Sequence, residues 1–307
     1  MKSNWEKHDP SLTARMVLSF AVLTLLYLAF LSFISFYFGL GILPMAIIAG
    51  LMIMSQWYFS DRIVLWSTGA KIVSKEEYPE LHAIVENLVS RANLPKPRIA
   101  VIKTDMPNAF ATGKGPRSSV VAVTTGLMRI LEKEELEGVI GHELIHVKHR
   151  DVTVITLASL FSTIAWFIMQ SSMFSSMYGG YGYGYNRQQQ GGGIFLVLIV
   201  AAIVWFLSFL IIRAISRYRE FAADRGSAFL TGQPKYLSRA LMKISGQIKV
   251  ALKQELRKVE GMNAFFIIPV VSGESIARLF STHPPLEERI KRLMEIEAAM
   301  RSGQPSL

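Results

Sequence analysis

Long uncharged apolar runs constrain what this chain can fold into more than any other feature of its sequence. The run over residues 16–38 contains no charged side chain and follows directly after Arg15. A helix needs about 20 such residues to cross a hydrocarbon core roughly 30 Å thick. Four runs of this kind occur, at residues 16–38, 42–59, 152–174 and 194–212. The chain is therefore predicted to carry four transmembrane helices arranged as two hairpins.

Other interpretations of these runs have to be weighed. The first run could be a cleaved signal peptide, but it exceeds the usual apolar region of about 7 to 15 residues, and no small-residue cleavage site follows it. The two later runs could be buried core helices, and residues 152–174 are the weaker candidate because Ser, Thr and Gln170 interrupt them. We expect all four runs to span the membrane.

Basic residues next to the runs predict an orientation. Lys and Arg collect on the cytoplasmic side of membrane spans. The turn at 39–41 is uncharged, and residues 178–193 carry only Arg187, in a Gly, Tyr and Gln sequence typical of a flexible loop. Basic residues border the runs on the other side, namely Lys2, Lys7, Arg15, Arg62, Arg150, Arg213, Arg217 and Arg219. Both termini and the polar segments are thus expected in the cytoplasm, below the cell membrane.

Cysteine content and net charge restrict the classes of chemistry. The chain has no cysteine, which agrees with a reducing compartment and excludes disulfides, thiolate metal sites and thiol catalysis. Its formal net charge is +10. A basic cytoplasmic face beside anionic lipid explains that charge, and no motif points to a nucleic-acid partner.

The polar segments predict a mainly helical domain with a small β-sheet, interrupted by the second hairpin. Its two parts would be residues 63–151 and 213–307, with the hairpins in residues 1–62 and 152–212. Helices are expected at 74–93, 127–131, 134–148, 211–230, 234–259 and 286–300 from their apolar spacing and capping residues. β-Branched residues bounded by Pro, Gly and Ser predict strands at 98–103 and 118–125, with a possible third at 107–112.

The motif H-E-x-x-H occurs within the helix predicted over residues 134–148. His142 and His146 are four residues apart, so both imidazoles lie on one helix face and can bind the same ion. Glu143 lies about 100° around the helix, where it can reach a water on that ion without being a ligand. Two coincidental surface histidines are the weaker interpretation, because the motif is specific. The spacing indicates a zinc site with Glu143 as its base.

A catalytic zinc site takes three protein ligands and a water, so a third ligand is missing from the motif. His149 lies on roughly the same face as His146, but one straight helix cannot complete a tetrahedron with it. A histidine at a helix end is the alternative for His149. Glu220 lies in a small apolar helical turn, where a carboxylate is unfavourable unless it is bound.

Asp224 follows Glu220 by four residues and lies on the same face. A zinc-bound imidazole usually donates its second N–H to a carboxylate, so Asp224 could orient His142. In the alternative, Glu220 pairs with Arg219 or Arg217, and Asp224 pairs with Arg225, on a solvated helix face. The spacing by itself leaves both arrangements open.

Several segments together resemble the HtpX proteases of the M48 metallopeptidase family. They are residues 108–113, 141–151 and 217–224, and Ser281-Thr282-His283-Pro284-Pro285 with Arg289. The similarity covers the chain except for the first nine residues, the Gly/Tyr/Gln loop and the last few residues. The resemblance implies a cytoplasmic, zincin-like α+β catalytic domain in an α-helical membrane protein.

The same resemblance implies roles for individual residues. His142, His146 and Glu220 would bind one zinc ion, and Glu143 would be the catalytic base. His149 stands where Asn is more usual, which weakens it as a ligand. The implied activity is endoproteolysis of misfolded or damaged membrane proteins in quality control.

Asn108 and Ala109 resemble the edge-strand segment with which related metalloproteases bind an extended peptide. An unpaired strand edge offers N–H and C=O groups that hold a substrate backbone irrespective of its sequence. A plain turn at residues 107–108 is the alternative.

His283 could donate to the oxyanion that forms at the scissile carbonyl, or could be a loop histidine with a backbone partner. Arg289 would anchor that loop or an acidic site residue, or form a surface salt bridge.

The sequence therefore predicts a zinc-dependent membrane endopeptidase acting on polypeptides, with a membrane transporter or channel and an inactive scaffold as rivals. A transporter would carry ionisable residues inside its spans, and the four runs have none between their flanks. A scaffold would not need Glu143 beside a pair of metal-binding histidines.

Overall fold

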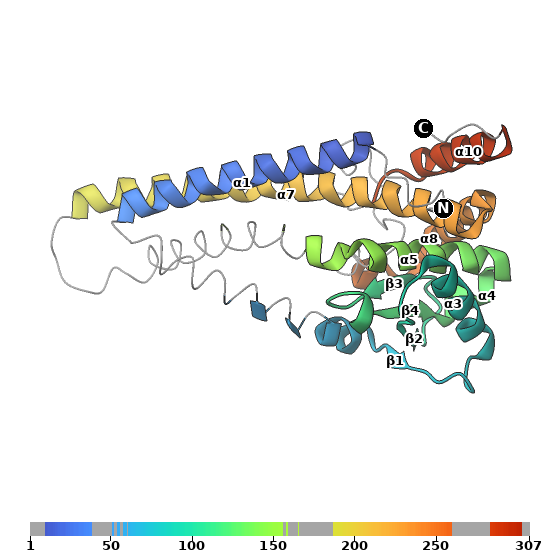
Figure 1. Cartoon of the computed structure of the whole chain (residues 1–307). Coiled ribbons are helices and arrows are strands. Elements are labelled where there is room, and N and C mark those ends of the chain that lie inside the picture. Colours follow the sequence, from blue (N-terminus) through green and yellow to red (C-terminus); the bar gives the residue numbers. More distant parts are fainter. Residues whose placement is uncertain are drawn as a thin grey trace. The chain divides into compact units, whose positions relative to one another are not determined.

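The structure is a computed structural model of the 307-residue chain (Figure 1). It describes residues 10–38, 51, 54–55, 58–59, 61–155, 158, 165, 187–259 and 283–302. Most of the predicted spans at 42–59 and 152–174 lies outside these residues, as do residues 178–186 of the predicted loop. Contacts divide the chain into unit 1, which comprises Met1–Thr13, Tyr58–Thr153 and Ser216–Leu307, and unit 2, which comprises Ala14–Trp57 and Val154–Ile215.

Unit 2 contains most of helix α1 (Pro10–Phe38) and the first part of helix α7 (Arg187–Thr231). These two helices lie side by side and pack through Tyr27 and Phe30 of α1 and Val197 of α7 (Figure 1). Among the described residues, Phe195–Thr231 is the one segment long and apolar enough to cross a membrane.

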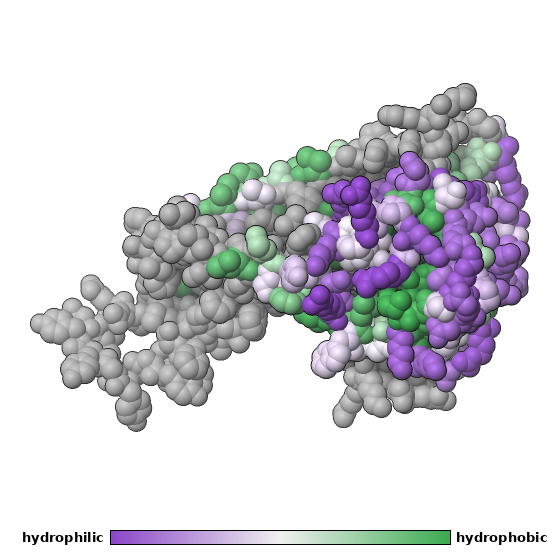
Figure 2. Space-filling model, turned by 60° about the horizontal axis from the view of Figure 1, so that its bottom comes forward, coloured by the Kyte–Doolittle hydropathy of each residue, from purple (hydrophilic) through white to green (hydrophobic). Residues whose placement is uncertain are grey.

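Both helices of unit 2 expose large apolar side chains. Leu18 and Leu25 of α1 are 65% and 66% exposed, and Phe195 of α7 is 64% exposed. By contrast, hydrophilic side chains gather on the face of unit 1 displayed in Figure 2. An apolar exterior of this kind suits contact with lipid, because exposing these side chains to water would be unfavourable.

The start of α7 differs from the sequence prediction. Residues 187–193, expected in the flexible loop, are the first residues of this helix. Gln188 to Gln190 are good helix formers, and extending an existing helix is far easier than nucleating one. The long apolar helix that follows therefore carries helical structure back across Gly191 to Gly193.

Unit 1 is built on a four-stranded sheet with the order β1-β2-β4-β3. Its strands are β1 (Lys71–Ile72), β2 (Arg98–Ile102), β3 (Ala109–Thr112) and β4 (Val120–Thr124). β2 and β4 are parallel, while β1 and β3 pair antiparallel at the two edges. The two strands predicted from β-branched residues and the possible third strand are confirmed as β2, β4 and β3. β1 is only two residues long, too short for a recognisable alternation of side chains.

Both faces of this sheet are covered, because alternate side chains of a strand point to opposite sides. On one face, Ile99 and Val121 join the main core, which includes side chains from α3 (Pro79–Ala92), α5 (Lys133–His149) and α8 (Pro234–Val259). On the other face, Ala100 and Ala122 pack near Val64 and Leu65. The predicted helix at 234–259 is confirmed, and those at 74–93, 127–131 and 286–300 appear as α3, α4 (Thr125–Ile130) and α10 (Leu286–Ser302).

Helix α5 begins at a run of acidic residues. The Glu132 backbone N–H donates to the Glu135 carboxylate at 3.0 Å, which satisfies one of the donors left unpaired at a helix start. Glu135 is 1% exposed, and Lys243 of α8 donates to it at 2.7 Å. This ion pair compensates a buried charge and fixes α8 against the first turn of α5.

Glycines let the neighbouring helices approach α5 closely. A Cβ added at Gly226 of α7 would lie 2.8 Å from two atoms of the Ile145 side chain, and one at Gly138 would lie 3.0 Å from the Leu237 backbone nitrogen. The Ser227 hydroxyl of α7 donates to the Gly138 carbonyl at 2.7 Å. Larger side chains at these positions would push α7 and α8 away from α5.

We predict that Gly226→Ala destabilises the protein by about 1–3 kcal/mol, because the added methyl overpacks against Ile145. Gly246→Ala is the matched control, since Gly246 lies in α8 with nothing near its missing Cβ. That substitution should stabilise the helix by about 0.5–1 kcal/mol. Melting temperatures of both variants in detergent check the prediction, and equal shifts would contradict it.

Candidate metal centre

Helix α5 presents two imidazoles on successive turns of one face. His142 is 1% exposed, and its Nε2 lies 3.0 Å from the Nε2 of His146, with the two rings nearly perpendicular at 88°. The four-residue spacing of the two histidines on one helix produces this convergence, as predicted. Two ring nitrogens that face the same point form half of a metal site.

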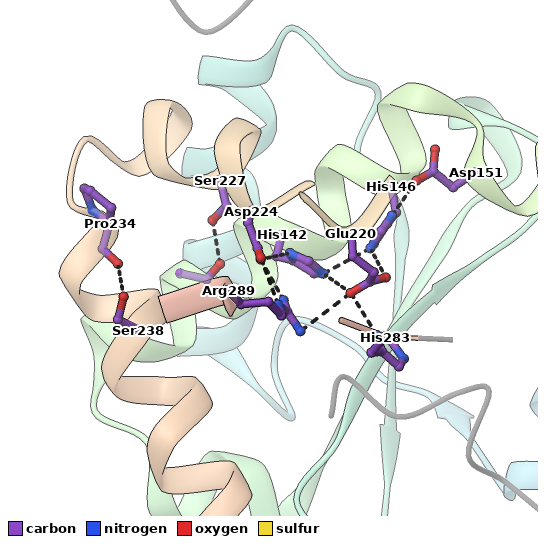
Figure 3. A network of polar contacts seen from close by, with 11 residues as sticks. His142, His146, Asp151, Glu220, Asp224, Ser227, Pro234, Ser238, His283 and Arg289 are labelled. Atoms are coloured by element: carbon purple, nitrogen blue, oxygen red, sulfur yellow. Dashed lines mark hydrogen bonds and ion pairs between the residues drawn. The ribbon is translucent and has the colours of Figure 1, made fainter. Parts of the chain in front are cut away.

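Helix α7 supplies a carboxylate to the same point (Figure 3). The Glu220 Oε1 atom lies 3.3 Å from His146 Nε2, and Oε2 lies 3.5 Å from His142 Nε2. One ligand atom from each of these three residues lies within 4.8 Å of the others. Two donors bound about 2.1 Å from a tetrahedral ion lie about 3.4 Å apart, so the spacing fits one metal ion.

The chemistry of the donor set also fits a transition metal such as zinc. Two imidazole nitrogens and one carboxylate are a known catalytic zinc combination that leaves a fourth position open. His149 is not part of the metal-binding group found among the described residues, and its carbonyl accepts from Arg219 at 3.0 Å. The structure thus brings Glu220, and not His149, to the histidine pair.

Asp224 and Arg289 lie behind His142. The His142 Nδ1 is 3.0 Å from Asp224 Oδ1. Arg289 of α10 donates twice to Asp224, from Nε at 2.8 Å and from a terminal nitrogen at 2.6 Å. Arg289 is 1% exposed, so it lies in the interior and not in a surface salt bridge. Burial raises the pKa of the Asp224 carboxyl, but Arg289 and His142 outweigh burial and lower it below its usual value.

Asp151 and Arg219, which were not predicted as site residues, lie behind His146. The His146 Nδ1 is 2.6 Å from Asp151 Oδ2, and the other oxygen of that carboxylate pairs with Arg219. Arg219 therefore pairs with Asp151, whereas the sequence alternative paired it with Glu220. A signal was present, since Asp151 is a carboxylate just past the end of the metal-binding helix.

Three imidazoles and one guanidinium surround the Glu220 carboxylate. Its Oε2 lies 2.8 Å from His283 Nδ1 and 3.6 Å from a terminal nitrogen of Arg289. Burial alone raises the pKa of the Glu220 carboxyl, but His283 and the two ligand imidazoles lower it well below its usual value. Glu220 is thus held as an anion, the form that binds a metal.

Glu143 lies on α5 where that helix packs against strand β3. Its side chain is 4% exposed, and burial raises the pKa of its carboxyl, while the neighbouring imidazoles and a backbone hydrogen bond from Ala111 act in the opposite direction. A carboxylate with a raised pKa beside a metal site has the properties of a general base.

Asn108 and Ala109 lie at the start of β3. The Asn108 N–H donates to the Thr124 hydroxyl at 2.9 Å, and the Asn108 carbonyl accepts from the Thr124 N–H at 2.9 Å. Both residues are buried, and Ala109 pairs with Val123 of β4. No other strand among the described residues pairs with the outer edge of β3. The segment is therefore part of an edge strand and not a plain turn.

Comparison with known proteins gives a consistent result. The family described as Peptidase family M48 matches residues 75–297. Protease HtpX homolog 2 of Methanosarcina mazei is 50% identical over 300 residues, which cover 98% of this chain and 100% of that protein. Protease HtpX homolog of Moorella thermoacetica is 52% identical over 292 residues, covering 95% of this chain and 96% of the relative.

A solved structure shows a similar fold. The crystal structure of S. mikatae Ste24p matches with a TM-score of 0.57 and 21% sequence identity. The match covers 90% of this chain but 64% of that chain, so this chain spans less than two thirds of its length.

We predict that Glu220→Ala removes bound metal, because only two histidines would remain. His149→Ala is the matched control and should retain one metal ion per chain, since its side chain is outside the group. Metal content of the purified full-length variants, measured by mass spectrometry after dialysis, checks both expectations. Metal retained in Glu220→Ala and lost in His149→Ala would move the third ligand to His149.

Proposed function

The chain belongs to peptidase family M48, and on this premise we propose that it is a zinc-dependent endopeptidase embedded in the cell membrane. Family membership makes it a metalloprotease, a hydrolase of peptide bonds. One observation carries the finer proposal: three ligand atoms from α5 and α7 converge beside a buried glutamate that faces an edge strand.

We propose that His142, His146 and Glu220 hold one zinc ion. When bound there, zinc supplies the Lewis acidity that polarises a peptide carbonyl and acidifies water. The protein's own part is to fix these three donors before the ion arrives. Asp224 and Arg289 support this by occupying the far side of the His142 ring, which leaves its Nε2 directed at the site.

Glu143 is proposed as the general base. It accepts a proton from the attacking water and returns the proton to the leaving amine. Its burial beside two imidazoles supports this assignment, because a carboxyl whose pKa lies nearer to neutrality transfers protons in both directions more readily.

The substrate is proposed to bind as an extended strand along β3. Strand β3 lies at the edge of the sheet, and an edge strand can pair with an extended peptide through backbone N–H and C=O groups without regard to side chains. Asn108 and Ala109 begin this edge, and the Asn108 backbone is fixed to Thr124 of β4. Such recognition requires an unfolded or extruded segment, which supports misfolded membrane proteins as substrates.

His283 is proposed to donate to the oxyanion that develops at the scissile carbonyl. Its ring lies 2.8 Å from the Glu220 carboxylate, so it is next to the metal-binding group. Charge that develops only in the transition state is the charge that such a donor stabilises most.

The membrane topology is also proposed here. We infer four spans at residues 16–38, 42–59, 152–174 and 194–212, with both termini and the catalytic domain in the cytoplasm. The exposed apolar side chains of α1 and α7 support the first and last spans. The basic residues that flank the spans support the orientation.

Glu143→Gln should lower proteolysis by at least about 10²-fold and retain zinc, because Glu143 acts on water and not on the ion. Full-length protein in detergent would be assayed for zinc content and for cleavage of casein. Glu134→Gln, in the exposed first turn of the same helix, is the control and should behave as wild type. Wild-type protein that bound no zinc and cleaved nothing would refute the proposed function.

His283→Ala should lower kcat on the order of 10²-fold with little change in KM or zinc content. His82→Ala is a matched control, since His82 is equally buried but bonds the Val73 carbonyl away from the site. It should lower the melting temperature and leave kcat unchanged at low temperature. A near-wild-type kcat in His283→Ala would remove His283 from the catalytic set.

A further inference from the structure

The two ligand imidazoles have the same arrangement behind them. His142 contacts Asp224, which is paired with Arg289, and His146 contacts Asp151 (Figure 3). Asp151 is in turn paired with Arg219. We propose that Asp151 and Arg219 are a positioning pair for His146. This inference rests on the proposed function, because it assumes that the site holds zinc.

The local backbone explains how Asp151 reaches the ring. Helix α5 ends at His149, and Arg150 takes up a left-handed conformation with φ 56° and ψ 42°. That turn redirects the chain and brings the Asp151 carboxylate to 2.6 Å from the Nδ1 of His146, five residues earlier. With Nδ1–H donating to Asp151, the Nε2 atom keeps its lone pair for the metal.

Each oxygen of Asp151 has its own partner. Oδ2 faces His146 and Oδ1 pairs with Arg219, so the carboxylate cannot rotate without losing one of them. Asp151 and Arg219 are both 6% exposed, which removes competing water. A fixed acceptor in a dry environment restrains the ring against rotation about its side-chain bonds.

Arg219 connects this arrangement to the other metal-binding helix. It precedes Glu220 in α7, and it also donates to the His149 carbonyl at 3.0 Å, at the end of α5. Arg219 is 6% exposed, and the pairing of its guanidinium with the Asp151 carboxylate compensates the cost of burying its charge. The pair could therefore be a structural link alone, and the test has to separate that role from positioning.

A double substitution separates the two roles. In Asp151→Ala, Arg219 is left buried without its carboxylate, so stability and zinc affinity should both fall. In Asp151→Ala/Arg219→Leu, both charges are removed, and stability should recover because an apolar pair replaces a buried ion pair with little loss. Zinc affinity should stay about 10 to 100-fold below wild type, since His146 still lacks its acceptor.

Zinc dissociation constants would be measured on full-length protein in detergent by competition with a chelator, and melting temperatures on the zinc-free forms. Asp224→Ala/Arg289→Leu is the comparison pair behind His142. Glu135→Gln is the matched control, because it removes the charge of a buried carboxylate that pairs with Lys243 at the other end of α5. It should lower the melting temperature and leave zinc affinity unchanged.

Wild-type zinc affinity in the double variant would overturn the proposal, as would a loss of affinity in Glu135→Gln as large as that in Asp151→Ala. If the alanine variants do not fold, Asp151→Asn keeps the shape of the side chain and should still weaken zinc binding severalfold. Wild-type affinity in that variant would also overturn it. Failure of the wild type itself to bind zinc would instead refute the proposed function.

Discussion

The close approach of helices α5 and α7 is the constraint on which the rest of the site depends. Two histidines on α5 provide only two ligand atoms, and the third comes from Glu220 of α7. Gly226 allows that approach because any side chain there would meet Ile145. The hydrogen bond from the Ser227 hydroxyl to the Gly138 carbonyl fixes the position of α7 along the axis of α5. A displacement of α7 away from α5 would lengthen the distances from the Glu220 carboxylate to the two imidazoles.

A second constraint follows from burial. The site places four carboxylates and two arginines in an interior where an isolated charge is strongly disfavoured. All of these groups except Glu143 are paired: Asp224 with Arg289, Asp151 with Arg219, and Glu220 with the imidazoles. These pairs leave Glu143 as the carboxylate whose pKa is raised. Electrostatic pairing therefore distinguishes Glu143, the proposed general base, from the three carboxylates that are held by arginines or imidazoles.

The sheet contributes an edge strand to the site. Among the described strands, β3 pairs only with β4, and an edge strand of this kind can pair with an extended peptide. The same strand reaches Glu143 through the Ala111 backbone. A peptide bound to β3, as proposed, would lie along the metal-binding helix, because α5 packs against β3.

Local sequence determined the described helices of unit 1, three of the four strands and the histidine pair, because these depend on spacing within one element. The H-E-x-x-H spacing alone places His142 and His146 on one face. Residues 187–193 have the composition of a loop but are helical, because the adjoining apolar helix extends through them. Residue spacing left the choice of the third ligand open, the family resemblance implied Glu220, and the tertiary structure brings Glu220 to the histidines. Only the tertiary structure showed that Arg289 pairs with Asp224 and that Asp151 lies behind His146. Those choices depend on distances between elements far apart in the chain, which no residue spacing encodes.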